Sequence, residues 1–162
     1  MALTSRQQKL LELCLADDGT VDELVATAAS TDTSDSRFAL ASTCEDASIS
    51  VGTETGGNTI KLTIQLKTVS GADIAARATV FSYLSDDANG DSIAGTAPSG
   101  GIAVATDGLA MPLIANKALM LTSESDGDID LNVVEAAGAT WYFILVLPNG
   151  RRIASSAITF AP

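Results

Sequence analysis

The sequence predicts a mainly β protein, an antiparallel β-sandwich preceded by a short N-terminal helical hairpin. Apolar and polar residues alternate over much of residues 58–162, and turn residues interrupt the pattern roughly every 8–12 residues. Residues 1–29 differ, because their apolar residues recur at helical spacing. Residues 30–57 are rich in Ser and Thr, so we interpret them as a linker and irregular segment. The chain therefore divides into an N-terminal helical segment, a linker and a β domain.

The helical hairpin is indicated by two capping signals near the N-terminus. Thr4 with Gln7 has the spacing of a capping box, and so does Thr20 with Glu23. An apolar stripe follows each start, and Asp17–Gly19 ends the first helix. Helices this short are marginally stable alone, so we expect them to pack on the β domain, a sister subunit or another protein. The residues that we expect to bind a partner are Leu10, Leu11, Leu24 and Val25.

The β domain is predicted from a series of short strands. Residues 60–67 alternate most clearly, with isoleucine and leucine on one face and lysine, threonine and glutamine on the other. In the apolar run at 141–147, Trp141 and Phe143 share one face and Tyr142 takes the other. Asn149-Gly150, between two strand-like runs, is typical of a β-hairpin. Further short strands are indicated near 49–51, 76–84, 102–104, 113–114, 119–121, 129–133 and 153–160.

Roughly seven short strands with frequent turns are typical of an immunoglobulin-like β-sandwich. The Cys-Trp-Cys spacing of antibody domains is absent, so the pattern predicts the architecture and not that family. The segment from Asp86 to Gly101 has too many glycine and proline residues for a strand. We expect it to form a long loop, which either extends toward a neighbour or stays on the surface.

Charge and termini limit the classes of partner. The formal net charge is -11, and the nine Lys and Arg residues are scattered, so we expect no nucleic-acid partner and no anionic membrane surface. The N-terminus does not read as a secretory signal, and the longest apolar run, at 141–147, is too short to span a membrane. Synthesis in a cytoplasm is therefore expected, with Cys14 and Cys44 reduced and buried.

The residue types present argue against catalysis and metal binding. The chain has no histidine, which excludes histidine-dependent nucleophilic catalysis and histidine-ligated metals, and we find no other catalytic motif. We therefore expect no enzyme, no catalytic residue and no cofactor. Asp126, Asp128 and Asp130 alternate as calcium ligands can, but Ile129 stands where an EF-hand loop requires glycine. We favour a solvated turn there, and likewise in the acidic segment 86–91, so no metal site is expected.

Several segments resemble the immunoglobulin-like modules of bacterial and phage surface proteins. The segments are a strand leading to a glycine turn (64–71), an alanine-rich strand (75–80), an Asp-Gly turn (125–131) and a late apolar strand (141–146). The opening Met-Ala-Leu-Thr-Ser-Arg-Gln and the stretch Ala-Gly-Thr-Ala-Pro-Ser-Gly-Gly from residue 94 are similar to small virion proteins of tailed bacteriophages. Within that group the resemblance is to capsid decoration, or cement, proteins.

This resemblance implies a non-enzymatic structural protein of the virion. Such a protein binds the major capsid protein on the outer capsid surface, after synthesis in the host cytoplasm. It acts as a homotrimer and stabilises the shell by bridging neighbouring capsomers. The same module occurs in phage tail proteins and adhesins. The alternative is therefore a tail or fibre-associated adhesion module that binds host-surface carbohydrate.

Overall fold

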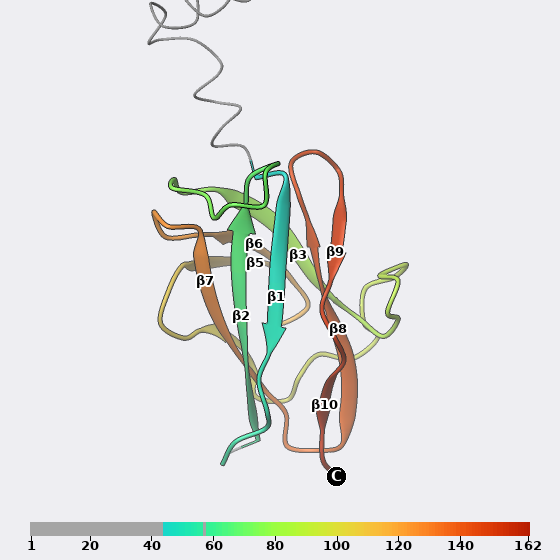
Figure 1. Ribbon diagram of the computed structural model, residues 1–162. Helices are drawn as coiled ribbons and strands as arrows, with labels where there is room; N and C mark the ends of the chain where they lie inside the picture. The colour runs from blue at the N-terminus through green and yellow to red at the C-terminus, as the bar shows by residue number, and fades with distance from the viewer. Residues whose placement is uncertain (1–43, 57) are drawn as a thin grey trace, which may run out of the picture. The chain divides into compact units, whose positions relative to one another are not determined.

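The computed structural model describes residues 44–56 and 58–162, which form two antiparallel β-sheets (Figure 1). This part of the chain contains no helix, and therefore none that is long and apolar enough to cross a membrane. The predicted helical hairpin at 1–29 lies outside the described residues. So do the four residues expected to bind a partner, which are Leu10, Leu11, Leu24 and Val25.

One sheet has four strands in the order β1-β2-β7-β4. Its two central strands place leucine and isoleucine side chains opposite one another, with Leu62 facing Leu131 and Ile64 facing Ile129. All four are fully buried, which confirms the alternation predicted for these two segments. The strands of this sheet are β1 (Asp46–Val51), β2 (Thr59–Lys67), β4 (Gly101–Val104) and β7 (Asp128–Val134).

The second sheet has six strands in the order β10-β8-β3-β6-β5, with β9 also paired to β8. The central strand β8 contains the apolar run predicted from the sequence. Trp141 and Phe143 lie in the core, whereas Tyr142 is half-buried on the opposite face, as predicted. The strands of this sheet are β3 (Thr79–Ser85), β5 (Leu109–Ile114), β6 (Ala118–Thr122), β8 (Ala139–Val146), β9 (Arg152–Ala154) and β10 (Ile158–Phe160).

Side chains from both sheets meet in one apolar core. Leu62 and Leu131 from the four-stranded sheet belong to the same buried cluster as Leu84 and Phe143 from the six-stranded sheet. The indole of Trp141 contacts the ring of Phe160 edge-on, with the ring centroids 6.2 Å apart. Burial of this apolar surface is the main favourable contribution to folding.

The β8–β9 hairpin confirms the prediction made from Asn149-Gly150. Gly150 has a φ of +81°, and its N–H donates to the carbonyl of Leu147. Beyond this turn, β9 and β10 form one interrupted edge strand along β8. The interruption is a β-bulge, because Ala154 pairs with Ile144 and Ile158 pairs with Trp141, which leaves one extra residue on the edge.

The structure differs from the sequence prediction in the number and extent of strands. The described residues form ten strands where roughly seven were expected, partly because the bulge divides the last strand in two. β1 lies within the segment interpreted as linker, where Ile49 and Val51 had indicated a short strand. It pairs along its whole length with β2, so the described β fold begins before residue 58. β5 extends over six residues although only Leu113 and Ile114 had suggested it.

Candidate interaction surface

The outer face of the four-stranded sheet is polar. Lys61 Nζ lies 2.6 Å from a carboxylate oxygen of Asp130, and the Thr63 hydroxyl donates to the other oxygen at 2.8 Å. Desolvation opposes ionisation of Asp130, but its hydrogen bonds to Lys61 and Thr63, together with the charge of Lys61, lower its pKa overall. This sheet therefore has the usual arrangement of an antiparallel sheet, with one apolar face in the core and one polar face outside.

The outer face of the six-stranded sheet carries a row of apolar side chains instead. Phe81 on β3 lies opposite Val146 on one side and Met120 on the other, and Met120 lies opposite Met111 on β5. These four side chains form a row across four strands, which we call the apolar row. Thus apolar residues occupy both faces of the sheet, a pattern typical of a sheet covered on both sides.

The loop between β3 and β4 covers part of this outer face, because Gly90 of the loop packs against Tyr83 and Ile144. Next to the apolar row, Tyr83, Ala118 and Ile144 form a small buried cluster of their own. The Tyr83 hydroxyl donates to the carbonyl of Gly90, which also accepts from Nη1 of Arg152 at 2.9 Å. The loop predicted at 86–101 therefore does not extend freely along its whole length, because its first part is held against the sheet.

The β3–β4 loop leaves β5, the strand at one edge of the sheet, exposed. Leu109, Met111, Leu113 and Ile114 are 48–60% exposed, and they account for four of the six large exposed apolar residues in the described chain. Among the described strands β5 is hydrogen-bonded only to β6, so the backbone groups of its other edge are paired with no strand. Its Pro112 suits an edge position, because proline cannot donate a backbone hydrogen bond. Exposed apolar edges of this length mark sites of protein contact or of aggregation.

Of the acidic residues singled out from the sequence, Asp126 lies in a turn as expected, whereas Asp128 and Asp130 lie on β7 and Asp130 is buried. Asp128 Oδ1 is buried without a hydrogen-bond partner, and desolvation, followed by the neighbouring charge of Asp130, raises the pKa of Asp128. In the other acidic loop, the Asp86 carboxylate accepts from the backbone of Gly95, and Asp87 accepts from the backbone of Asn89. The described residues include no group of three or more acidic or cysteine side chains placed to hold a metal ion.

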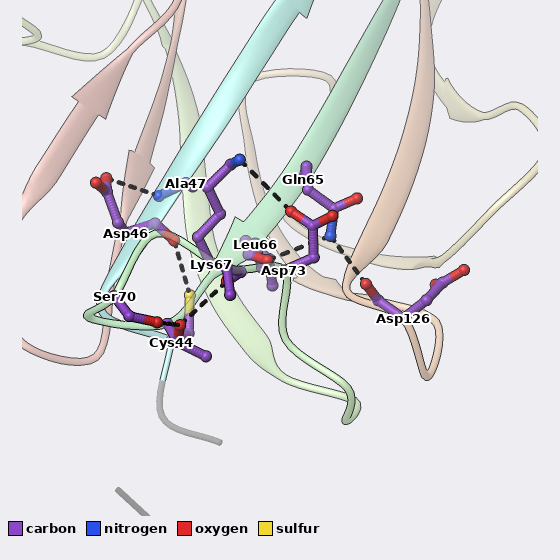
Figure 2. A network of polar contacts seen from close by, with 11 residues as sticks. Cys44, Asp46, Ala47, Gln65, Leu66, Lys67, Ser70, Asp73 and Asp126 are labelled. Atoms are coloured by element: carbon purple, nitrogen blue, oxygen red, sulfur yellow. Dashed lines mark hydrogen bonds and ion pairs between the residues drawn. The ribbon is translucent and has the colours of Figure 1, made fainter. Parts of the chain in front are cut away.

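Polar contacts connect the end of β2 to neighbouring turns, close to Cys44, the first described residue. Figure 2 shows the Gln65 amide donating to the backbone carbonyls of Leu66 and Asp126, which joins β2 to the turn before β7. Lys67 forms an ion pair with Asp73 across the next turn. Burial raises the pKa of the neighbouring Cys44 thiol, which is 3% exposed, as predicted for a buried cysteine. These contacts connect backbone segments of the fold.

Sequence reasoning therefore named candidate partner-binding residues outside the described part of the chain and missed an exposed apolar surface within it. The missed residues are those of β5 and of the apolar row. A signal for them existed: both faces of the 141–146 run are apolar, and Leu-Ala-Met-Pro-Leu-Ile at 109–114 has no polar side chain. A continuous apolar strand in an antiparallel sheet indicates burial on both faces. Comparison with protein-family models, with curated proteins and with solved structures found no match to this chain.

Proposed function

We propose that this protein is a non-enzymatic structural protein of a tailed-phage virion that binds the outer capsid surface. In this proposal the chain binds the major capsid protein and bridges neighbouring capsomers. The observation that carries the proposal is the outer face of the six-stranded sheet, which is apolar yet partly uncovered by the described chain. Exposed apolar patches on a protein surface are often sites of contact with another protein, and such a contact is what a subunit of an assembly needs.

The strand order supports an immunoglobulin-like sandwich within this proposal. In immunoglobulin domains the sheets have the orders A-B-E-D and G-F-C. The orders β1-β2-β7-β4 and β10-β8-β3 match if these strands are named A to G in sequence. β5 and β6 are then an additional hairpin placed beside strand C. The resemblance of the sequence to immunoglobulin-like phage modules agrees with this assignment.

The proposed mechanism is the addition of interface area to an assembled shell. Any molecule that binds the assembled state and not its separated parts stabilises the assembled state. The predicted amphipathic segment at 1–29, with Leu10, Leu11, Leu24 and Val25, would supply the contact with the capsid. The β domain would then project from the surface, where its apolar outer face can meet neighbouring subunits.

The alternative function, carbohydrate binding by a tail or fibre module, receives less support. Sugar sites usually stack the ligand on exposed aromatic rings. Among the described residues Trp141, Phe143 and Phe160 are at most 3% exposed, and only Phe81 and Tyr142 are partly accessible. We therefore propose capsid binding in preference to adhesion.

Adding the protein back to capsids that lack it tests the proposal. The full chain should bind, and it should raise the temperature at which the shells break open. A chain that lacks residues 1–29 should bind at least tenfold more weakly, provided that its β domain still unfolds cooperatively. Equal binding by both chains would refute the role given to the N-terminal segment. Absence of binding by the full chain, together with binding on a glycan array, would support adhesion instead.

A further inference from the structure

We infer that β5 is the contact through which copies of this chain associate with one another. This inference goes beyond the proposed function, because it names the surface between subunits and does not depend on a capsid. Its starting point is the exposure of Leu109, Met111, Leu113 and Ile114 on a single edge strand. The apolar row continues this surface inward over β6 and β3, through Met120 and Phe81.

The distribution of charge favours a second copy of this chain as the partner that binds β5. The chain as a whole carries a net charge of -11, so a basic partner would be drawn to its acidic loops. Residues 109–122, which form β5, β6 and their turn, contain one charged side chain, Lys117, and no acidic one. Two copies that meet at β5 therefore keep their acidic residues out of the contact. An uncharged apolar strand is also the best partner for another uncharged apolar strand.

The size of the surface predicts a weak contact. Four large side chains, each about half exposed, offer roughly 400 Å² of apolar surface per copy, the size of the largest patch on an ordinary monomer. Two copies would bury about 800 Å², and about 1,000 Å² with the neighbouring row, which is near the lower limit for a specific interface. Free copies should therefore associate only at high concentration. Copies held side by side on a surface would associate far more readily, because their effective concentration is higher.

The backbone of β5 also limits how many copies can associate through this edge strand. Pro112 removes one backbone donor from β5, and the pairing register with β6 shifts between Pro112 and Ile114. Proline and irregular pairing interrupt the continuous strand addition that leads to fibres. A small closed assembly is therefore the form of association that this strand favours.

Sedimentation velocity of the full chain over a wide range of concentrations tests the inference. The mean mass should rise with concentration, and it should rise further as salt screens the repulsion between acidic copies. Met111→Lys should weaken the association at least tenfold, because it places like charges in an apolar contact. Val69→Lys is the matched control, since Val69 is 80% exposed in the turn after β2 and should leave the association unchanged.

Two results would overturn the inference. One is a wild-type chain that stays monomeric at millimolar concentration and high salt, and the other is equal association by both lysine variants. Hydrogen exchange of the wild-type chain gives a second readout that needs no substitution. Exchange in residues 109–122 should slow as concentration rises, while exchange in the β8–β9 turn should not change. Because no capsid is present, these results are separate from the test of capsid binding.

Discussion

At Gly90 the β3–β4 loop packs directly against the outer face of the six-stranded sheet. Its φ is +69°, and a Cβ there would lie 2.9 Å from Cγ1 of Ile144 and 3.1 Å from the hydroxyl oxygen of Tyr83. The substitution Gly90→Ala therefore has two costs. The left-handed backbone costs about 1–2 kcal/mol with a side chain present, and crowding against a packed surface costs about 1–3 kcal/mol more. We expect the free energy of unfolding to fall by about 2–5 kcal/mol.

Gly71→Ala separates the two costs. Gly71 has a φ of +80°, but no heavy atom lies within 4 Å of the position of its Cβ. This variant should lose only the backbone contribution of about 1–2 kcal/mol. Urea unfolding can be followed by the fluorescence of Trp141, the single tryptophan of the chain, which is 3% exposed. Equal losses in the two variants would refute the packing of the loop on the sheet.

Further substitutions test the core and the charged residues. Leu145→Ala should reduce the free energy of unfolding by about 2–5 kcal/mol, because the side chain is fully buried. Leu113→Ala at the exposed edge should reduce it by less than about 1 kcal/mol. Equal losses for the two variants in urea unfolding would contradict the assigned burial. The pKa of Asp130 is lowered in the folded state, so its ionised form stabilises the protein above the unfolded pKa of about 4. The destabilisation by Asp130→Asn should therefore shrink as pH falls through the folded pKa. The pKa of Asp128 is raised, so Asp128→Asn should stabilise the protein at neutral pH and lose this effect below about pH 4. Urea unfolding of both variants between pH 3 and 7 measures these changes in the free energy of unfolding. If both substitutions stabilised the protein at neutral pH, or both destabilised it, the assigned pKa shifts would be contradicted.

The sequence predicts those strands that have one apolar face and one polar face. β2 and β7 alternate between apolar and polar residues, and the buried faces were identified from that alternation alone. The β8–β9 hairpin was likewise predictable, because Asn149-Gly150 specifies a local turn. In each case the information lies within a few neighbouring residues. Local patterns of this kind depend on backbone geometry and not on distant contacts.

The apolar outer face could not be predicted in the same way. Phe81, Met111 and Val146 lie far apart in the sequence, and only the pairing register of four strands brings them into one row. The packing of Gly90 on this face also depends on contacts with residues distant in the sequence, namely Ile144 and Arg152. A composition rich in small residues predicts a loop but not the surface on which it packs.

The copy number of this protein in purified virions tests the central claim most directly. Under the proposed function, quantitative mass spectrometry would compare it with the major capsid protein of the same particles. A protein that covers the lattice should be present in a number equal to that of the capsid subunit or in a simple fraction of it. A few copies per particle would instead place the protein at the tail or portal and contradict the decoration role. Complete absence from virions would contradict a structural role in the particle altogether.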